Sequence, residues 1–201
     1  MMRCELRVIA LAVFLAYCAA PAYAADTATI QQTGSNGNAT INQIGNEGNA
    51  DSVITQGGGD GNAVVINQSG IVQTDFAGVA RVWVEQVGSG NSAQLNQSGT
   101  DLQDAAFYQT GNDNRATVTT FAGRAGVGVI QMGNGNGADV TFDTSRSGLE
   151  VLQTGNNNYA RVSEHDGGFF SVRASMNGNG NSAYIDVTGT WGDVQTLKNG
   201  D

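Results

Sequence analysis

The stretch Gln86–Gln97, which reads QVGSGNSAQLNQ, decides the fold. It follows the pattern Q-x-G-x-x-N-x-A-x-h-x-Q, where h is an apolar residue, and the first eight positions recur along the chain. Further copies begin at Gln109, Gln131, Gln153 and, with methionine in the first slot, Met176. The copies start 22 or 23 residues apart. A fixed period of this length indicates a repeat architecture.

The N-terminal part of the chain carries a close variant of the repeat, in which Asn stands directly before Ala. Followed through the chain, the glutamine slot or its equivalent occurs fourteen times, and twelve of the thirteen steps are 11 to 13 residues long. The step from Gln68 to Gln86 is 18 residues long, which predicts an insertion near Gly70 to Ala77, either a loop or an extra bent layer. The slots are residues 32, 43, 56, 68, 86, 97, 109, 120, 131, 142, 153, 164, 176 and 187.

Each slot follows a short alternation of apolar and other residues, as in Ala93-x-Leu95-x-Gln97. A period of two is typical of a strand with one buried face. The intervening segments, such as Gly133-Asn-Gly-Asn-Gly, are rich in residues that tolerate the positive φ of tight turns. Because one strand–turn–strand unit cannot bury its apolar face alone, the units must stack. The sequence predicts an all-β solenoid with two facing parallel sheets and, from fourteen slots taken in pairs, about seven two-strand layers.

The repeated amides have a structural explanation in such a stack. A buried amide is destabilising unless it is hydrogen-bonded. In stacked layers, each amide can bond to the same amide one layer above and one layer below. We therefore predict structural ladders that also support self-assembly. The predicted ladder residues are Gln32, Gln43, Gln56, Gln68, Gln86, Asn91, Gln97, Gln109, Asn114, Gln131, Asn136, Gln153, Asn158 and Asn181.

Residues 1–24 have the features of a secretory signal peptide. Arg3 and Arg7 form a positive n-region, Val8 to Ala20 is an apolar run, and Ala22-Tyr23-Ala24 is a small-x-small cleavage site. A membrane anchor is the alternative, but the run is shorter than the roughly 20 residues of a membrane span. We predict a signal peptide at residues 1–24 and a single repeat domain at residues 25–201, which contains neither cysteine nor proline.

The charge of the chain disfavours nucleic acid and anionic membranes as partners, because both select a basic surface. The full sequence has 9 basic and 18 acidic residues. Removal of the signal peptide, with Arg3, Arg7 and Glu5, leaves 7 basic and 17 acidic residues, a net charge of −10. An acidic surface of this kind favours solubility before assembly.

The predicted domain lacks the residues of a catalytic or metal site. Its single histidine, His165, lies in a Glu-His-Asp-Gly segment that predicts an exposed turn, which argues against a zinc site or a Ser-His-Asp triad. Gly57–Asn62 resembles one copy of the calcium-binding nonapeptide repeat, but calcium solenoids need tandem copies. We expect no enzyme activity, no cofactor, no metal and no small-molecule substrate.

The repeat resembles that of the curlin family, which reads S-x5-Q-x-G-x-x-N-x-A-x-x-x-Q. Gln86–Gln97 matches the Q-to-Q portion at every specified position, and the units at Gln109, Gln131 and Gln153 match through Ala. The resemblance covers about Ile30 to Val187. It implies a subunit of extracellular amyloid fibres of bacterial biofilms, which crosses the periplasm and leaves through an outer-membrane secretion pore. The implied partners are like subunits and a nucleator subunit at the cell surface.

The chain departs from the family pattern toward its C-terminus. Other residues replace glutamine at five slots, which are Thr120, Phe142, Glu164, Met176 and Val187. We therefore expect the ladder to decay after Gln109, with local distortion if the charged Glu164 points inward. The family's N-terminal export segment is not evident, because the first repeat begins only a few residues after Ala24.

The first and last layers of the predicted stack leave unpaired β edges that can accept another chain. The tail from Trp191 to Asp201 is short and polar and would form a weak cap at most. Open ends predict head-to-tail polymerisation into a fibre. The alternatives are a nucleator or minor subunit, or a monomeric secreted solenoid that acts as an adhesin or binding module. Ice binding would require a regular outward row of threonines, which Asp51, Gln94 and Arg161 interrupt.

Overall fold

The computed structural model describes residues 17–19, 26–46, 49–72, 79–100, 104–121, 126–142, 147–165, 168, 170–188, 190 and 192–200. Every helix or strand in these segments is a β-strand. The predicted signal peptide lies outside the described residues, except that the backbone of Tyr17–Ala19 forms β1. Residues 73–78, most of the predicted insertion, also lie outside them, whereas Gly70 to Val72 belong to the end of β5.

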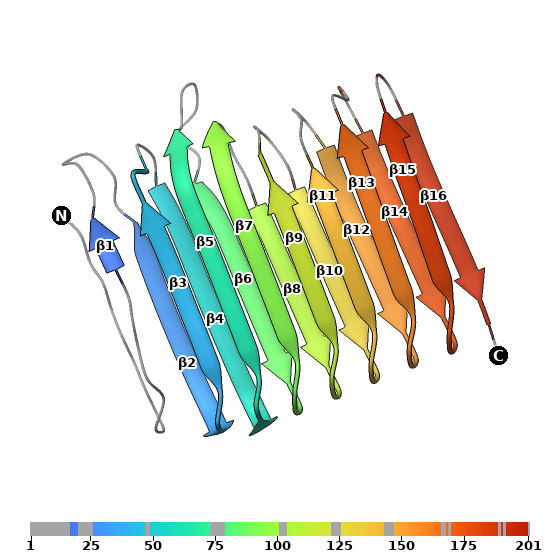
Figure 1. Cartoon of the computed structure of the whole chain (residues 1–201), viewed down its shortest axis with the longest axis horizontal. Coiled ribbons are helices and arrows are strands. Elements are labelled where there is room, and N and C mark those ends of the chain that lie inside the picture. The colour runs from blue at the N-terminus through green and yellow to red at the C-terminus, as the bar shows by residue number, and fades with distance from the viewer. Residues whose placement is uncertain are drawn as a thin grey trace.

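The strands form two eight-stranded parallel sheets, and consecutive strands from β2 onward alternate between them (Figure 1). We call these the odd sheet and the even sheet, after the strand numbers. The odd sheet contains β1 (Tyr17–Ala19), β3 (Asn38–Ile44), β5 (Ala63–Val72), β7 (Ser92–Thr100), β9 (Arg115–Thr120), β11 (Gly137–Phe142), β13 (Tyr159–His165) and β15 (Ser182–Thr188). The even sheet contains β2 (Thr27–Ser35), β4 (Asn49–Asp60), β6 (Val79–Val87), β8 (Asp104–Thr110), β10 (Gly126–Met132), β12 (Ser147–Thr154), β14 (Phe170–Asn177) and β16 (Gly192–Asn199).

The chain is therefore a β-solenoid, in which each strand pairs with the strand two places further on. Strands β2 to β15 form seven successive pairs, which confirms the predicted solenoid of about seven two-strand layers with two facing parallel sheets. The sequence left open whether the C-terminal tail caps the stack, as a weak cap at most. Residues Gly192–Asn199 form β16, which pairs in register with β14 and adds half a layer. The alternation Val194-x-Thr196 continues the strand period into the tail.

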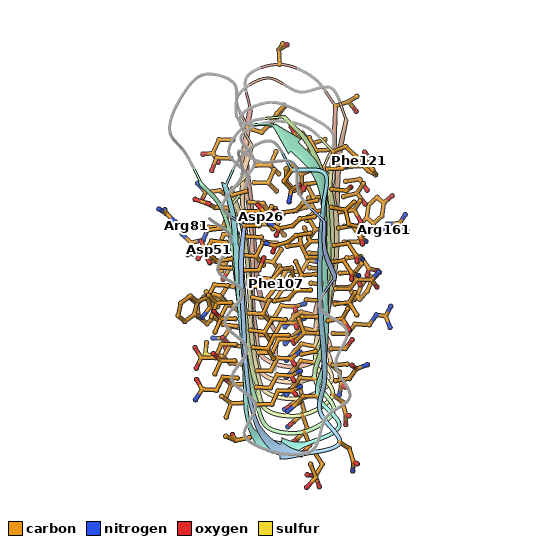
Figure 2. The ribbon with its side chains drawn as sticks, turned by 90° about the vertical axis from the view of Figure 1, so that its left-hand side faces the viewer. Asp26, Asp51, Arg81, Phe107, Phe121 and Arg161 are labelled. Carbon is orange, nitrogen blue, oxygen red and sulfur yellow. The ribbon has the colours of Figure 1, made fainter. Side chains whose placement is uncertain are left out.

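The core lies between the two sheets and runs along the whole stack. Every second residue of each strand points inward, which gives the alternating burial of strands such as β8 and β10. In Figure 2 Phe107 lies between the sheets, whereas Arg81 and Arg161 point away from opposite faces. Phe107 has no exposed surface, and its in-register neighbours Val84 and Val129 are equally buried. Each such side chain contributes roughly 1.5–3 kcal/mol relative to an exposed one.

Glu164 faces this core from β13 and has no exposed surface, as the repeat period requires. On the side of β15 the strands stay in register through Glu164 and Val187, whereas on the side of β11 the pairing ends at Ser163, so the expected distortion is confined to the β11 side. Glu164 also takes part in an interaction within the structure, so it is not an isolated charge. The prediction of a turn at His165 is wrong, because this residue is the last of β13.

Candidate functional site

The glutamines of the even sheet form one continuous hydrogen-bonded column. Strands β2, β4, β6, β8, β10 and β12 pair in register, so their glutamines lie above one another, and each is at most 5% exposed. Each Nε2 donates to the Oε1 of the next layer. The bonds are Gln32 to Gln56, Gln56 to Gln86 at 2.8 Å, Gln86 to Gln109 at 2.6 Å, Gln109 to Gln131 at 2.7 Å and Gln131 to Gln153 at 2.8 Å.

Backbone carbonyls across the narrow core hold these amides in one orientation. The Nε2 group of each glutamine after Gln32 also donates to a carbonyl of the preceding odd-sheet strand. The acceptors are Asn38 at 3.4 Å, Ala63 at 3.2 Å, Ser92 at 3.0 Å, Arg115 at 2.9 Å and Gly137 at 2.8 Å. An amide flipped by 180° would present its oxygen to a carbonyl oxygen. The Oε1 atoms therefore point toward the N-terminal end of the stack, and the Nε2 atoms toward the C-terminal end.

The odd sheet has a shorter glutamine column. Gln43 Nε2 donates to Gln68 Oε1 and Gln68 Nε2 to Gln97 Oε1, both at 3.0 Å. Thr120 follows Gln97 in register, and the buried Nε2 of Gln97 has no hydrogen-bond partner. The predicted decay after Gln109 thus begins earlier in the odd sheet, after Gln97. In the even sheet it begins later, because Gln131 and Gln153 still belong to the column and Met176 ends it.

The predicted asparagines form a second column, at the turn that joins each even strand to the following odd strand. From Asn91 onward, each Oδ1 accepts a hydrogen bond from the backbone N–H of the next asparagine at 3.0–3.1 Å. The Nδ2 groups also donate to a glycine carbonyl of the next layer at 2.8–2.9 Å, in Asn91, Asn114, Asn136 and Asn158. Asn62, which stands in the variant repeat but was not among the predicted ladder residues, starts this column. The members in order are Asn62, Asn91, Asn114, Asn136, Asn158 and Asn181.

Two more asparagine columns were missed from the sequence. One runs on the outer face of the odd sheet through Asn42, Asn67 and Asn96, with amide-to-amide bonds of 2.8 Å. The other follows the exposed turns, with amide-to-amide bonds of 2.9–3.0 Å between Asn112, Asn134, Asn156 and Asn179. The sequence could have revealed both columns, because these asparagines also recur at a constant position of the repeat.

The first glycine of each turn allows the layers to approach closely. Gly133 has a φ of +120°, and a Cβ on it would lie 2.0 Å from the carbonyl oxygen of Gly155 in the next layer. No other residue fits there, since the position combines a left-handed backbone with direct backbone contact. The repeated glycine is therefore a requirement of the stacking itself.

The N-terminal end of the even sheet is the free edge of β2. Gln32 is 5% exposed, and its Oε1 has no hydrogen-bond partner. Asp26 lies just before β2 and is also buried. Its carboxylate accepts hydrogen bonds from Asn46 Nδ2 at 3.1 Å and from the backbone N–H of Ala50 at 3.0 Å. Burial raises the pKa of Asp26 above its ordinary value, and the two hydrogen bonds oppose part of this rise.

The C-terminal end is stepped, because β16 extends the even sheet half a layer beyond β15. The inward side chains of β16, Val194 and Thr196, are only partly buried. A notch of about 450 Å³ lies beside the free edge of β15, and its lining includes Thr188, Thr190 and Thr196. Within the described segments, the even sheet thus has an unpaired strand edge at both ends.

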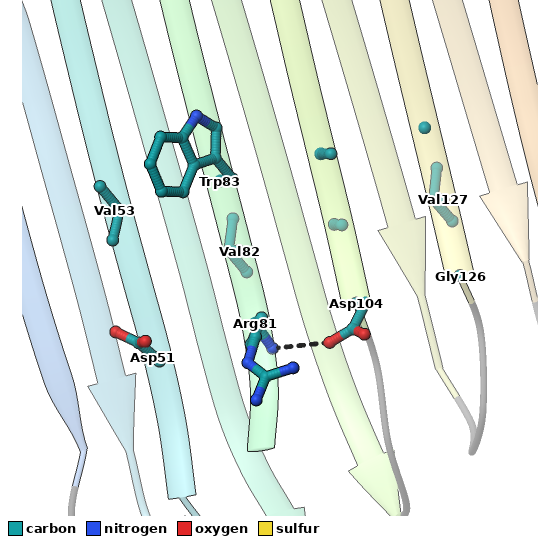
Figure 3. A pocket seen from close by; sticks show the side chains of 11 residues that line it. Asp51, Val53, Arg81, Val82, Trp83, Asp104, Gly126 and Val127 are labelled. Atoms are coloured by element: carbon teal, nitrogen blue, oxygen red, sulfur yellow. Dashed lines mark hydrogen bonds between the residues drawn. The ribbon is translucent and has the colours of Figure 1, made fainter. Parts of the chain in front are cut away.

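A groove of about 450 Å³ lies on the outer face of the even sheet (Figure 3). Trp83, which is 45% exposed, forms one wall, and the small residues Ala106, Gly126 and Gly128 leave the space beside it. Arg81 stands at the polar side, between Asp51 and Asp104. Its backbone N–H donates to Asp104 Oδ1 at 3.1 Å. This combination of an exposed indole with charged neighbours suits a small ligand that has one apolar face.

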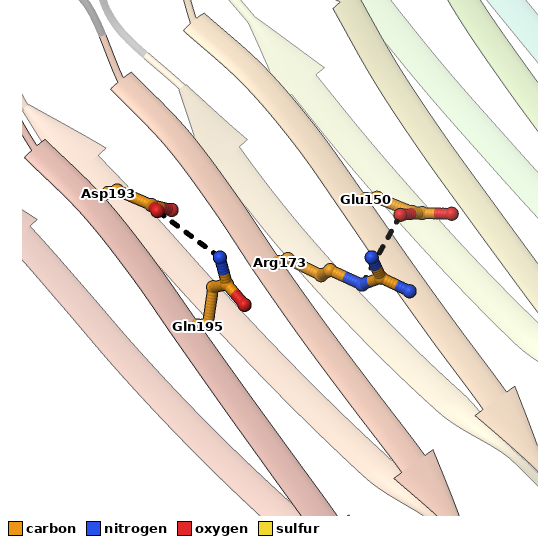
Figure 4. A network of polar contacts seen from close by, with 4 residues as sticks. All are labelled: Glu150, Arg173, Asp193 and Gln195. Carbon is orange, nitrogen blue, oxygen red and sulfur yellow. Dashed lines mark hydrogen bonds and ion pairs between the residues drawn. The ribbon is translucent and has the colours of Figure 1, made fainter.

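The outer face of the even sheet also carries a polar network near its C-terminal end (Figure 4). Arg173 Nε lies 3.6 Å from Glu150 Oε2, and Gln195 Nε2 donates to Asp193 Oδ2 at 3.2 Å. Exposed pairs of this kind contribute about 0–1 kcal/mol. We assign them to a solvated surface.

Within the described segments, no three His, Cys, Asp or Glu side chains are grouped so that they could hold a metal ion. The same segments contain no helix with the length and apolar character needed to cross a membrane. Comparisons with protein-family models, with curated proteins and with solved structures found no match for this chain.

Proposed function

We propose that this protein is a structural subunit of an extracellular, curli-like amyloid fibre that grows by end-to-end stacking of its solenoid. The observation that carries the proposal is the buried, unpartnered Oε1 of Gln32 on the free edge of β2. A buried polar atom without a partner is rare in a completed structure. Here the atom is placed to accept the next hydrogen bond of a column that already runs through six layers.

The geometry of the stack supports growth in one dimension. Another solenoid that arrives at either end can extend the parallel backbone pairing and the amide columns together, as in cross-β structures. Identical layers impose no rotation that would close a ring, so the product is an open fibre. The acidic surface, with a net charge of −10 for residues 25–201, keeps the separate subunits soluble.

The location and the partners follow from the resemblance to curlin repeats and from the predicted signal peptide. The chain would cross the periplasm and leave the cell through an outer-membrane secretion pore. It would then polymerise with copies of itself, starting from a nucleator subunit at the cell surface, and contribute to adhesion and the biofilm matrix. A nucleator or minor subunit is a variant of this proposal, because the odd-sheet ladder is incomplete. We assign the protein no catalytic role.

Self-seeded assembly tests the proposal. Residues 25–201 are diluted from denaturant, and assembly is followed with an amyloid-binding dye. We expect a lag phase that preformed fibres abolish, and fibre diffraction with the spacings of about 4.8 and 10 Å that stacked strands and facing sheets give. A folded, β-rich monomer that never polymerises under seeded conditions would refute the fibre subunit.

A monomeric secreted binding module is the second candidate, and the groove beside Trp83 favours it. In that case the wild-type protein stays monomeric in the assembly assay. A ligand that stacks on the indole would change the tryptophan fluorescence, and Trp83→Ala would abolish this change. Val87 on the same strand offers a matched control, because it is 41% exposed and does not line the groove.

A further inference from the structure

The even-sheet column has a direction, which constrains how two copies can meet. Its amides are held by the opposite backbone carbonyls, so every Oε1 faces the N-terminal end and every Nε2 faces the C-terminal end. A new layer at the N-terminal end must therefore supply a hydrogen-bond donor. A new layer at the C-terminal end must supply an acceptor.

The acceptor at the N-terminal end is Gln32 Oε1, which is buried and has no partner. The Nε2 of the same side chain already donates to Gln56, so the amide cannot rotate to offer a donor without breaking that bond. The free edge of β2 beside it presents unpaired backbone groups.

The C-terminal end presents a donor in the same column. Lys198 on β16 pairs in register with Met176, which itself pairs with Gln153, so lysine stands in the glutamine slot of the last half layer. Its Nζ donates to the carbonyl oxygen of Ser182. Ser182 belongs to the same register column as Gly137, the carbonyl that holds Gln153. The ammonium group thus occupies the place of a ladder Nε2 and has further protons to donate.

We propose that β16 of one copy pairs with β2 of a second copy, and that Lys198 donates a hydrogen bond to Gln32 Oε1 across this joint. The inference rests on the proposed fibre function and gives the fibre its polarity. With Lys198 opposite Gln32, the register places Val194 opposite Ala28 on the inner face. On the outer face it places Asp193 opposite Thr27, where a carboxylate can accept from a hydroxyl.

The stepped end fits this joint. Among the described residues no strand of the odd sheet lies opposite β16, and the notch there is lined by three threonines together with apolar residues such as Val187 and Val194. At the N-terminal end, β1 occupies the matching half layer of the odd sheet. It lies in the predicted signal peptide, so the joint depends on β2 and β16 alone.

Two variants that each block one end test the joint. Lys198→Glu places an acceptor against the Gln32 acceptor, and Gln32→Leu removes the acceptor at the other end. Arg115→Glu is the matched control, since it makes the same charge change on the exposed outer face of β9, inside the stack. Lys198→Gln is the conservative variant, because it supplies an amide donor in place of the ammonium. Circular dichroism of each variant checks that the solenoid forms.

Seeded elongation and native mass spectrometry give the readouts. We expect each blocking variant alone to elongate at least about tenfold more slowly than the wild type, as loss of one charge-assisted hydrogen bond implies. Arg115→Glu and Lys198→Gln should grow at the wild-type rate. An equimolar mixture of the two blocking variants should form heterodimers, because it retains one intact end of each kind.

Other outcomes separate the joint from the fibre function. Wild-type growth by Lys198→Glu, or homodimers of either variant alone, would overturn the joint while the fibre function stands. A wild-type protein that stays monomeric with seeds would overturn both.

Discussion

The even sheet and the odd sheet share one repeat, yet they fill the glutamine slot differently. In the even sheet, six glutamines form an unbroken column from Gln32 to Gln153. In the odd sheet, three glutamines are followed in order by Thr120, Phe142, Glu164 and Val187, all of which are buried. Both sheets nevertheless keep parallel register along the stack.

This difference shows that the ladder is a property of neighbours rather than of single residues. Phe142 fills its slot with apolar surface and is 1% exposed, so a layer does not require an amide there. Stability is lost at the junction, where the next residue in the column does not accept a hydrogen bond from the amide Nε2. Gln97 stands at such a junction, and its Nε2 has no partner.

The largest contrast between the sheets should come from replacing one glutamine in each. We expect Gln109→Leu to lower the free energy of unfolding by about 2–5 kcal/mol, since it removes ladder partners from both Gln86 and Gln131. Gln97→Leu should change it by less than about 1 kcal/mol, because it removes one unpartnered Nε2 while creating another at Gln68. Urea denaturation below the assembly concentration measures both values. Equal losses would show that the two ladders contribute alike.

A smaller effect is expected from placing an isolated amide in the odd sheet. Phe142→Gln inserts an amide between Thr120 and Glu164, where it cannot continue the column. We expect a loss of about 1–3 kcal/mol in unfolding free energy from the desolvated amide and the lost apolar contacts. Phe142→Leu is the apolar control, and it should be the less destabilised variant. The reverse order would mean that this slot prefers an amide.

Moving the junction one layer further should have a smaller effect. Thr120→Gln places an amide oxygen next to the unpartnered Nε2 of Gln97, but the new amide directs its own Nε2 toward Phe142. We expect a change of less than about 1 kcal/mol in unfolding free energy, because one unpartnered Nε2 replaces another. Urea denaturation measures this change, and a loss as large as that of Gln109→Leu would contradict the junction explanation.

The smallest effect concerns pH at the start of the even sheet. The pKa of Asp26 is raised by burial, so the folded state holds the carboxyl proton more tightly than the unfolded state. Its contribution is most favourable below the ordinary value of 3.8 and is lost as pH rises through the folded pKa. The stability of the wild type relative to Asp26→Asn should therefore increase as the pH falls toward 3.8. Parallel urea titrations of the two proteins measure this difference, which would be constant if Asp26 had an ordinary pKa.

The period of the sequence was sufficient to predict the solenoid, its layers and the glutamine columns, but only part of the asparagine columns. It could not reveal the orientation of the amides, because this depends on carbonyls such as Ala63 and Ser92 from the facing sheet. The strand β16 was missed because Lys198 breaks the glutamine pattern although the alternation continues. The groove beside Trp83 depends on small residues in neighbouring layers, and these are far apart in the sequence.

The fixed orientation of the even-sheet amides has an electrical consequence. Each side-chain amide is a dipole, and aligned dipoles add as they do along a helix. The column is therefore negative at Gln32 and positive at its other end. Each hydrogen bond in such a chain polarises the next, with estimates of about 10–30% per bond. Because Met176 interrupts the column in every copy, this polarisation stays within one solenoid. The Gln32 acceptor is therefore strengthened to the same extent in a single solenoid and at the end of a filament.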